Sequence, residues 1–261
     1  MQSQGLSQQV AIVAGASRGI GAAIALELAK RGARVLITYV SPSAESTASQ
    51  LVTKINGLGH GAAAIAIRAD MRDRESPKKI VEACVGTFGS TIDILVNNAG
   101  TALQAALPET THELYDAVMD LNVRGVIFLT QAVLPHLPAS GGRIINIGSV
   151  ASRIPASDCV YLASKAALEA LTRSWARELG PCGCSVNTVA PGVTETELLS
   201  GQAAENPTFA SFLEGLKEQT VMQKRMGTPG DIALVVAMIA EPQSQWITGQ
   251  YIAACGGVIM V

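Results

Sequence analysis

The chain has 261 residues, of which 48% are hydrophobic, 15% are charged and only 4% are aromatic. Its formal net charge of −2 argues against a protein that grips nucleic acid, because such proteins carry a basic excess. Five cysteines in a chain of this length do not suggest a disulfide framework, and the histidines show no ligand spacing around Cys182 and Cys184, so no metal is expected. The first residues lack the basic and apolar regions of a signal peptide, and no uninterrupted apolar run reaches the roughly 18 residues of a membrane-spanning helix. We therefore expect a cytoplasmic protein with no membrane partner.

Short apolar runs alternate with longer helical patterns along the chain. The predicted strands are Val10–Ala14, Arg34–Tyr39, Ala62–Arg68, Ile92–Val96, Arg143–Ile147, Ser185–Ala190 and Gln250–Ala253. The predicted helices are Ile20–Arg31, Ser43–Asn56, Asp73–Phe88, Thr111–Leu137, Val160–Leu179 and Pro229–Ala240. In the long fourth helix, Gly125 and Pro135 are expected to mark a bend and an end. Alternation of this kind implies right-handed βαβ units, so we expect one α/β domain, residues 1–261, with a doubly wound parallel sheet of about seven strands and helices on both faces.

The stretch Gly192–Met226 is the least regular, since it mixes Gly, Pro, Thr and charged residues with short apolar groups. An irregular insertion of this length is usually functional or mobile. We predict a lid that gives the substrate a largely hydrophobic pocket, and the alternative is a surface excursion with no role in catalysis. The apolar residues of this stretch are Leu198, Leu199, Phe209, Phe212, Leu213 and Met222.

The first predicted strand runs directly into GASRGIG, residues 15–21, which opens the first predicted helix. Gly15 allows the sharp turn, Gly19 lets the backbone approach a pyrophosphate, and Gly21 lets the helix pack closely on the strand. The phosphates would meet unpaired N–H groups at the positive end of the helix dipole. A glycine triplet in this position predicts a dinucleotide site, with a tight turn that holds no ligand as the alternative.

No acidic residue ends the second predicted strand, where the sequence reads ITYVSPS, residues 37–43. An Asp or Glu there would bind the ribose 2′-hydroxyl of NAD and repel a 2′-phosphate. Its absence, with Arg18 in the glycine loop, favours NADP(H), because arginine can pair with a phosphate in a bidentate way. The alternative for Arg18 is a solvated surface residue. The hydroxyls near the strand end are Thr38, Tyr39, Ser41 and Ser43.

Tyr161 and Lys165 stand four residues apart in VYLASKAAL, so on a helix they share a face. A phenol has an ordinary pKa of ~10. A neighbouring ammonium and the positive nicotinamide of the oxidised cofactor both lower it, which would let the tyrosine donate a proton to a ketone oxygen near neutral pH. Ser149 ends a predicted strand, where its hydroxyl can bind the substrate carbonyl and stabilise the charge that develops there. Chance copies of Y-x-x-x-K are common and often reflect ordinary packing, and Ser152 is an alternative hydroxyl.

These motifs resemble the short-chain dehydrogenase/reductase family, in the glycine spacing G-x-x-x-G-x-G, the segment NNAG at residues 97–100, Ser149 in IINIGSVAS, and Y-x-x-x-K. They are spread over nearly the whole chain. The resemblance implies a Rossmann fold and a catalytic tetrad completed by Asn122, which in the family holds a helix distortion and a water that connects the lysine to solvent. The alternative for Asn122 is a buried side chain that satisfies helix backbone alone. Ala14 departs from the family's usual Thr, which removes a structural hydroxyl.

The resemblance also implies the roles of several cofactor-binding residues. Asp70 would bind the adenine amino group, Met71 would give a backbone contact, and the segment Pro191–Thr196 would hold the nicotinamide carboxamide. The predicted catalytic residues are Asn122, Ser149, Tyr161 and Lys165. The predicted NADP(H)-binding residues are Gly15, Ser17, Arg18, Gly19, Ile20, Gly21, Tyr39, Ser41, Asp70, Met71, Asn97, Ala99, Gly100, Tyr161, Lys165, Pro191, Gly192, Val193 and Thr196.

The complete tetrad predicts an NADPH-dependent oxidoreductase that reduces a ketone to a secondary alcohol, with Tyr161 as the proton donor. The C-terminal segment ITGQYIAACGGVIM extends the resemblance to 3-oxoacyl-carrier-protein reductases and fungal polyhydroxynaphthalene reductases, which implies a 3-oxoacyl, polyketide-like or other hydrophobic ketone. The alternatives are an NADP-dependent alcohol dehydrogenase that works oxidatively, and an NADP(H)-binding regulatory protein with little turnover. By resemblance we expect a homo-oligomer, a tetramer with a dimer as the alternative.

Overall fold

The computed structural model describes residues 5–155, 158–205 and 207–260. In this described part of the chain, seven strands form one parallel sheet in the order β3-β2-β1-β4-β5-β6-β7. The strands are β1 (Val10–Val13), β2 (Arg34–Tyr39), β3 (Ala63–Arg68), β4 (Ile94–Asn97), β5 (Arg143–Ile147), β6 (Ser185–Pro191) and β7 (Tyr251–Ala254). The order reverses between β1 and β4, as in a Rossmann fold, and opens a crevice at the carboxyl ends of the strands. This confirms the predicted doubly wound parallel sheet.

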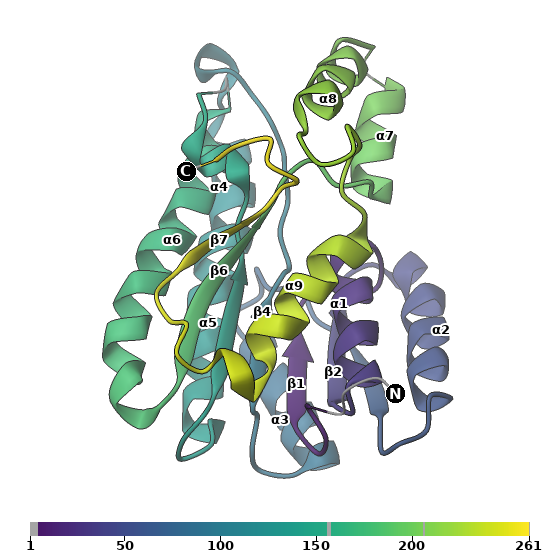
Figure 1. Ribbon diagram of the computed structural model, residues 1–261, viewed down its shortest axis with the longest axis vertical. Helices are drawn as coiled ribbons and strands as arrows, with labels where there is room; N and C mark the ends of the chain where they lie inside the picture. The colour runs from purple at the N-terminus through teal and green to yellow at the C-terminus, as the bar shows by residue number, and fades with distance from the viewer. Residues whose placement is uncertain (1–4, 156–157, 206, 261) are drawn as a thin grey trace.

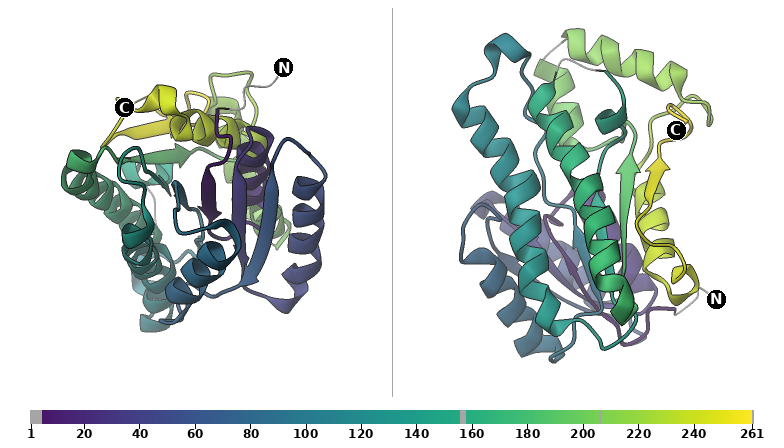
Figure 2. Two further views of the ribbon diagram at one scale, coloured as in Figure 1. Left: turned by 90° about the horizontal axis from the view of Figure 1, so that it is seen from below. Right: turned by 90° about the vertical axis from the view of Figure 1, so that its left-hand side faces the viewer.

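Helices cover both faces of this sheet (Figures 1 and 2). They are α1 (Gly19–Lys30), α2 (Glu45–Asn56), α3 (Ser76–Phe88), α4 (His112–Met119), α5 (Gly125–Val133), α6 (Cys159–Leu179), α7 (Glu197–Glu205), α8 (Pro207–Gln219) and α9 (Pro229–Ala240). Successive strand residues point to opposite faces, so Ala11 and Val13 pack with α1, α2 and α9, whereas Val10 and Ile12 pack with α3, α5 and α6. The strands are thus buried on both faces, which explains their continuous aliphatic sequence.

The predicted boundaries agree with the structure within a few residues, and β2, β5 and α9 have the predicted bounds. Local signals explain where helices begin. The Thr228 hydroxyl accepts the N–H of Asp231, the Asp231 carboxylate accepts the N–H of Thr228, and Pro229 stands at the first helical position of α9. Thr111 caps α4 by a single bond, in which its hydroxyl accepts the N–H of Leu114.

The predicted long helix is continuous from His112 to His136, but it changes its geometry along the way. Between α4 and α5, residues Asp120–Arg124 form a π-helical turn that ends just before Gly125, and Leu134–His136 close the stretch as a 3-10 turn around Pro135, where the end was predicted. Gly125 lies against β3's following loop, where an added Cβ would stand 2.9 Å from the carbonyl oxygen of Met71.

This stretch of 25 residues, with a mean hydropathy of 1.4, is the one helix among the described residues that is long and apolar enough to cross a membrane. That is weak evidence, because core helices of water-soluble proteins pass the same test. Here α4 and α6 lie side by side (Figure 2), and α5 packs with α3 and α6 on one face of the sheet, where its residues Leu129 and Val133 are buried. The absence of a membrane partner stays a prediction.

Residues 192–226 were predicted to be irregular, and this prediction was wrong. They contain the helices α7 and α8, which stand above the carboxyl ends of the strands (Figure 1). Both helices are rich in good helix formers such as Glu, Leu, Ala and Lys. They do not lie on a face of the sheet, so their sequences lack the regular apolar stripe from which a helix is predicted. Of the apolar residues named above, Leu213 is buried, Phe212 and Met222 are exposed, and the side chain of Leu198 lies outside the described residues.

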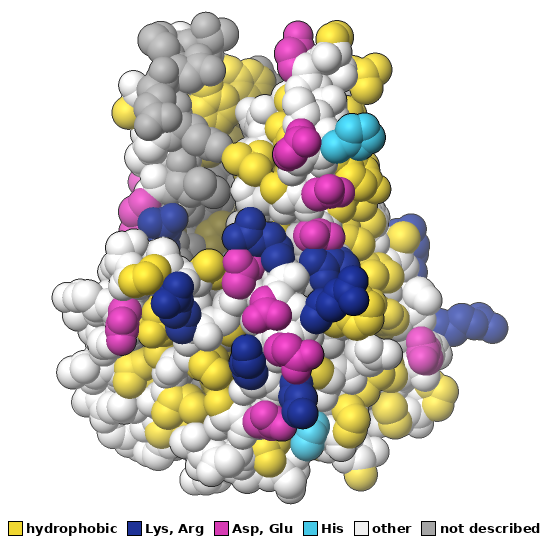
Figure 3. All heavy atoms as spheres, turned by 180° about the vertical axis from the view of Figure 1, so that it is seen from behind, with side chains coloured by type: hydrophobic (Ala, Val, Ile, Leu, Met, Phe, Trp, Pro, Cys, Tyr) yellow, Lys and Arg dark blue, Asp and Glu magenta, His cyan; other side chains and the backbone are white. Residues whose placement is uncertain are grey.

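On the face opposite to the view of Figure 1, basic and acidic side chains are interspersed (Figure 3). The part of that face whose side chains are described carries no continuous stripe of basic side chains alone or of acidic side chains alone. This agrees with the near-neutral net charge, while the absence of a nucleic-acid partner stays a prediction.

Candidate active site

The glycine loop between β1 and α1 has the backbone that the sequence requires. Gly15 and Gly19 have φ angles of 66° and 57°, in the left-handed region that favours glycine. An added Cβ at Gly15 would stand 2.8 Å from the Cα of Ala99, and one at Gly21 would collide with the carbonyl of Gly15. Among the described residues no side chain caps α1, and its first turn holds no acidic residue. The first N–H groups of α1 therefore fit an anion such as a pyrophosphate.

Two side chains that the sequence analysis did not assign brace this loop. The hydroxyl of Thr38 accepts the N–H of Gly15 at 2.8 Å, and Asn98 Nδ2 donates to the carbonyls of Ala14 and Gly15 at 2.9 and 2.8 Å. Thr38 on β2 thus supplies a hydroxyl next to Ala14, which has none. The signal for Asn98 was its place in NNAG, beside the predicted Asn97.

Asn97 has a different role from the one predicted. Its side chain is 2% exposed and donates to Thr130 Oγ1 and Asn146 Oδ1 at 3.0 and 2.8 Å. It therefore joins β4, β5 and α5 in the core rather than reaching into the crevice.

A cleft of about 550 Å³ lies between the glycine loop and the start of α7. It is lined by Gly19, Glu195, Thr196, Glu197, Ser200 and Pro229. Thr196 faces the loop, since a Cβ at Gly19 would stand 3.5 Å from its methyl group, and its hydroxyl accepts the N–H of Leu199. The structure thus brings Gly19 and Thr196, two predicted cofactor-binding residues, together in the lining of one cleft.

The chain that leads to Thr196 leaves the sheet beside β7. Pro191 is the last residue of β6, and a Cβ at Gly192 would stand 2.8 Å from the Cβ of Cys255, so glycine lets the two strand ends pass. The carbonyl of Val193 accepts the N–H of Gly227 at 2.9 Å. This bond closes the base of the segment that carries α7 and α8.

The carboxyl end of β2 carries two hydroxyls and lies against an arginine of β3. Ser41 and Ser43 are exposed and hydrogen-bonded to each other at 2.8 Å, and Arg18 is exposed at the start of α1. Arg68, which the sequence analysis missed, is exposed at the end of β3 and donates through Nε to the carbonyl of Val40 at 2.8 Å. The signal was its place at the end of the third predicted strand. Arg68 therefore adds a cation beside Ser41, where a 2′-phosphate was predicted.

The remaining predicted nucleotide contacts differ in how accessible they are. Tyr39 packs partly against the apolar cluster of α1, α2 and α9, as does Ile20, and Met71 is buried. The carboxylate of Asp70 is bound by Arg72, with Nη2 at 2.6 Å and the backbone N–H at 2.9 Å, and this hydrogen bonding lowers the pKa of Asp70. Among the described residues, no three His, Cys, Asp or Glu side chains form a group that could hold a metal ion.

The predicted tetrad comes together beside β5. The hydroxyl of Ser149, just after β5, accepts the N–H of Ala151 at 3.1 Å and lies close enough to the phenol of Tyr161 to lower its pKa. Lys165 Nζ lies 5.8 Å from the centre of the Tyr161 ring and donates to the carbonyl of Ile147 at 2.9 Å. A Cβ at Gly100 would stand 3.2 Å from Asn122 Oδ1 and 3.5 Å from Lys165 Nζ, so Asn122 and Lys165 flank this glycine.

Asn122 lies in the π-helical turn and is 1% exposed. Its Oδ1 accepts the N–H of Thr101 at 2.9 Å, and its Nδ2 donates to the Thr101 carbonyl and to Ser164 Oγ, both at 3.0 Å. It therefore bonds the loop after β4 and helix α6, not its own helix backbone. π-helical turns are frequent at functional sites.

Burial favours the uncharged form of both Tyr161 and Lys165, so it raises the pKa of the phenol and lowers the pKa of the amine. Removal of the Tyr161 phenol from water raises its pKa, and the nearby Ser149 hydroxyl offsets only part of this. Burial lowers the pKa of Lys165 to about 8. In the protein alone, desolvation of the Tyr161 phenol outweighs the effect of the Lys165 ammonium, which is bonded to the Ile147 carbonyl. The predicted lowering, which also involves the positive nicotinamide of the oxidised cofactor, stays a prediction.

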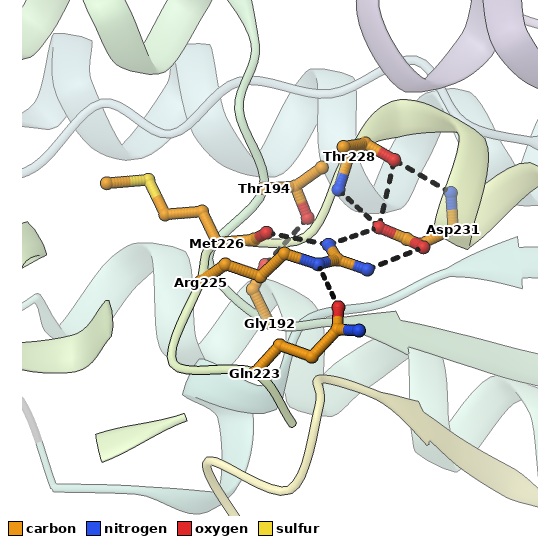
Figure 4. A network of polar contacts seen from close by, with 7 residues as sticks. All are labelled: Gly192, Thr194, Gln223, Arg225, Met226, Thr228 and Asp231. Carbon is orange, nitrogen blue, oxygen red and sulfur yellow. Dashed lines mark hydrogen bonds and ion pairs between the residues drawn. The ribbon is translucent and has the colours of Figure 1, made fainter. Parts of the chain in front are cut away.

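An ion pair fastens the return from α8 to the start of α9 (Figure 4). Arg225 donates to both carboxylate oxygens of Asp231, at 2.7 and 3.1 Å, and Asp231 in turn accepts the N–H and hydroxyl of Thr228. Just before it, Gln223 and Lys224 have φ angles of 60° and 44°, which are strained for residues with a side chain. The base of the α7–α8 segment is therefore held by side chains, next to a strained turn.

Comparison with known proteins agrees with this geometry. The family model described as enoyl-(acyl carrier protein) reductase matches residues 15–259. Dehydrogenase OXI1 of Cochliobolus heterostrophus is 46% identical over 87% of this chain and 98% of its own length. Short-chain dehydrogenase/reductase FrzI of a Cladobotryum species is 45% identical over 98% of both chains.

Among solved structures, the angucycline C-6 ketoreductase LanV with bound NADP superposes with a TM-score of 0.88 at 34% identity, over 98% of both chains. The match of sequence and structure extends over nearly the whole chain, including the glycine loop and the Y-x-x-x-K helix. The chain belongs to the short-chain dehydrogenase/reductase family of oxidoreductases.

Proposed function

We propose that the protein is an NADPH-dependent ketoreductase, which reduces the carbonyl of a hydrophobic ketone to a secondary alcohol. The observation that carries the proposal is the convergence of Ser149, Tyr161 and Lys165: the Ser149 hydroxyl lies beside the Tyr161 phenol, and Lys165 Nζ lies 5.8 Å from the centre of the Tyr161 ring. Each of these two neighbouring hydroxyls has one proton to donate, and both can turn to a single acceptor, the oxygen of a ketone. Asn122 and Lys165, on either side of Gly100, complete the catalytic group.

The residues present fit NADP(H). The uncapped start of α1 and the glycine loop suit a pyrophosphate, and the cleft between Gly19 and Thr196 continues from it. The end of β2 lacks an acidic residue, and the cations Arg18 and Arg68 suit a 2′-phosphate. The bound NADP of LanV supports the same choice of cofactor.

The chain's own residues would handle the proton. With its raised pKa, Tyr161 is a protonated phenol at neutral pH and is ready to donate to the ketone oxygen. Ser149 donates a hydrogen bond to the same oxygen and so stabilises the charge that develops on it. When bound, NADPH supplies the hydride that adds to the carbonyl carbon. The Lys165 ammonium then stabilises the tyrosinate until a proton returns to it, and Asn122 holds the Thr101 loop beside that ammonium.

The same residues serve both directions, because the proton donor of the reduction is the base of the oxidation. Reduction is proposed over the oxidative alternative because LanV is named as a ketoreductase. A regulatory protein with little turnover would not need a paired serine and tyrosine or a buried lysine. For the substrate we propose a 3-oxoacyl, polyketide-like or other hydrophobic ketone, since Phe209 and Phe212 stack with ring centres 6.3 Å apart on α8 and LanV is named as a ketoreductase.

We also propose that residues 192–226 act as a lid on a single domain spanning 1–261. The protein would be a cytoplasmic homo-oligomer, a tetramer or a dimer, with a small-molecule substrate and with no metal, nucleic acid or membrane partner.

The test is NADPH consumption with a panel of ketones, enoyl thioesters and the matching alcohols, run with wild type and with Tyr161→Phe. We expect ketone-dependent oxidation of NADPH, a loss of nearly all turnover in the variant, and unchanged NADPH binding by fluorescence titration. Turnover of enoyl thioesters alone would replace carbonyl reduction by double-bond reduction. Near wild-type activity of Tyr161→Phe would show that another group donates the proton.

A further inference from the structure

A carboxylate of α6 holds the turn that directly follows Ser149. This turn, Val150–Arg153, is a short 3-10 helix. Glu169, which is 8% exposed, accepts Ser152 Oγ through Oε1 at 2.5 Å and Arg153 Nη2 and Nε through Oε2 at 2.8 and 3.0 Å. One buried carboxylate therefore uses both of its oxygens on two consecutive residues.

Glu169 also has a defined place relative to the proposed catalytic pair. Tyr161, Lys165 and Glu169 follow one another at intervals of four residues, so they line one face of α6. The same face thus presents the Tyr161 phenol, beside Ser149, and the carboxylate that holds the turn after Ser149. The Ser149 hydroxyl is itself tied to this turn, because it accepts the N–H of Ala151 at 3.1 Å. Before Ser149, the main chain is held in the sheet by the bond from Gly148 N–H to the Val189 carbonyl at 2.8 Å. Glu169 therefore helps to fix where Ser149 lies relative to Tyr161 on α6.

The protons in this cluster can be counted. Ser152 Oγ lies 2.5 Å from Glu169 Oε1 and 2.7 Å from the Ser149 carbonyl oxygen, but a hydroxyl carries only one proton. A carboxylate paired with Arg153 is the stronger acceptor, so the proton of Ser152 points to Glu169. The Ser149 carbonyl keeps the backbone N–H of Ser152 at 3.2 Å and the hydroxyl of Tyr251 at 3.5 Å. Loss of Glu169 would both loosen the turn and let the Ser152 hydroxyl turn to the peptide of Ser149.

The partner of the carboxylate is fixed from a second side. The guanidinium of Arg153 stacks over the ring of Tyr251 on β7, 3.7 Å from the ring centre. The arginine is therefore held even in a variant that lacks Glu169, and such a variant chiefly frees Ser152 and the peptide of Ser149.

We propose that Glu169 is a positioning residue for ketone reduction: by gripping Ser152 and Arg153 from the helix face of Tyr161, it sets the hydroxyl of Ser149 against the phenol. Glu169 does not touch the reacting atoms, and it acts through Ser149. The proposal rests on the proposed function, because it assigns a residue to that same reaction.

The test compares Glu169→Ala and Glu169→Gln with Glu178→Ala, which removes an exposed glutamate of the same helix as a matched control. We expect Glu169→Ala to lower kcat by about 10- to 100-fold, the range for a misplaced reacting group, with unchanged NADPH affinity. Glu169→Gln keeps an acceptor for Ser152 and should lose less. Glu178→Ala should match wild type.

The deciding measurement is the same pair of Glu169 variants in a Ser149→Ala background. A residue that acts only through Ser149 has no further effect on kcat there, whereas a merely structural role gives the same fold loss in both backgrounds. Thermal unfolding shows whether Glu169→Ala is folded. If it is not, the comparison of Glu169→Gln with and without Ser149→Ala decides. Wild-type kcat in the Glu169 variants, or equal losses in both backgrounds, would overturn this role and leave ketone reduction standing. A wild type with no ketone turnover would overturn both.

Discussion

Thr38 and Gly15 are joined by a hydrogen bond of 2.8 Å, which the Gly15 N–H donates to the Thr38 hydroxyl. Thr38 itself is almost fully buried. The carbonyl of Thr38 also accepts the N–H of Ala16 at 2.9 Å. One residue of β2 thus holds two consecutive N–H groups at the turn of the glycine loop. Because Ala14 has no hydroxyl, the shape of this loop depends on Thr38.

The first prediction concerns that bond. Thr38→Val keeps the shape of the side chain but leaves the Gly15 N–H without its partner, which should cost about 1–3 kcal/mol of stability. The dissociation constant for NADPH should rise several-fold, because the loop is less well fixed. Urea denaturation and fluorescence titration measure the two effects. Thr38→Ser keeps the hydroxyl and serves as the control, and a Thr38→Val protein with wild-type stability would contradict the role of this bond.

The sequence predicted the frame of the site because that frame follows from strong local rules. Strands buried on both faces must be aliphatic, and a glycine loop between a strand and a helix has few other uses, so Gly15, Gly19 and Gly21 could be placed in advance. The spacing of Tyr161 and Lys165 on a helix face was equally secure.

What the sequence did not predict depends on contacts between distant segments. Arg68 reaches the end of β2 only because β3 pairs with β2, and Glu169 meets Ser152 only after the turn folds onto α6. The raised pKa of Tyr161 is of the same kind, because it follows from burial, which the spacing to Lys165 does not reveal. The helices α7 and α8 were not predicted because they stand above the carboxyl ends of the strands and do not pack on a face of the sheet.

The second prediction concerns the choice of cofactor. Arg68→Ala should reduce kcat/KM with NADPH by about tenfold or more and leave that with NADH nearly unchanged, because an arginine that pairs with a phosphate contributes about 1.5–3 kcal/mol. Arg18→Ala should act in the same direction. Steady-state kinetics with both cofactors measure the ratio.

Lys78→Ala, which removes an exposed cation on α3, controls for a general loss of positive charge. If Arg68→Ala changes both cofactors alike, the guanidinium does not read the 2′-phosphate.

The third prediction follows from Lys165, whose pKa burial lowers to about 8. Catalysis needs its ammonium, so kcat/KM for ketone reduction should fall above about pH 8 as the proton leaves. Stability responds in the opposite sense. The unfolded chain holds this proton more tightly, so the contribution of Lys165 to stability rises with pH between about 8 and the ordinary value of 10.5.

Tyr161 does not produce this fall, because its pKa is raised and the phenol stays protonated in that range. A pH–rate profile of the wild type tests the assignment, with Lys165→Arg as the comparison, since arginine keeps its charge and should move any remaining limb to higher pH. A wild-type profile that stays flat well above pH 8 would assign no role to the charge of Lys165.

The last prediction separates the anchoring of α7 and α8 from the stability of α9. Arg225 bonds Asp231 from the segment that returns from α8, whereas Thr228 caps α9 through the same carboxylate. Arg225→Gln should therefore raise KM for the ketone, because the base of the lid is released, and should leave NADPH affinity nearly unchanged. Thr228→Ala removes the cap and should cost about 1 kcal/mol of stability with little change in KM.

Thermal unfolding and ketone kinetics of the two variants, measured side by side, check this division. Because hydrogen bonds from Arg225 and Thr228 hold the pKa of Asp231 far below its usual range, the contacts should persist over the whole pH range of the assay. A rise in KM should thus be seen at every pH for Arg225→Gln. If Thr228→Ala raises KM as much as Arg225→Gln does, the start of α9 and the lid move as one unit, and the ion pair is not a separate anchor.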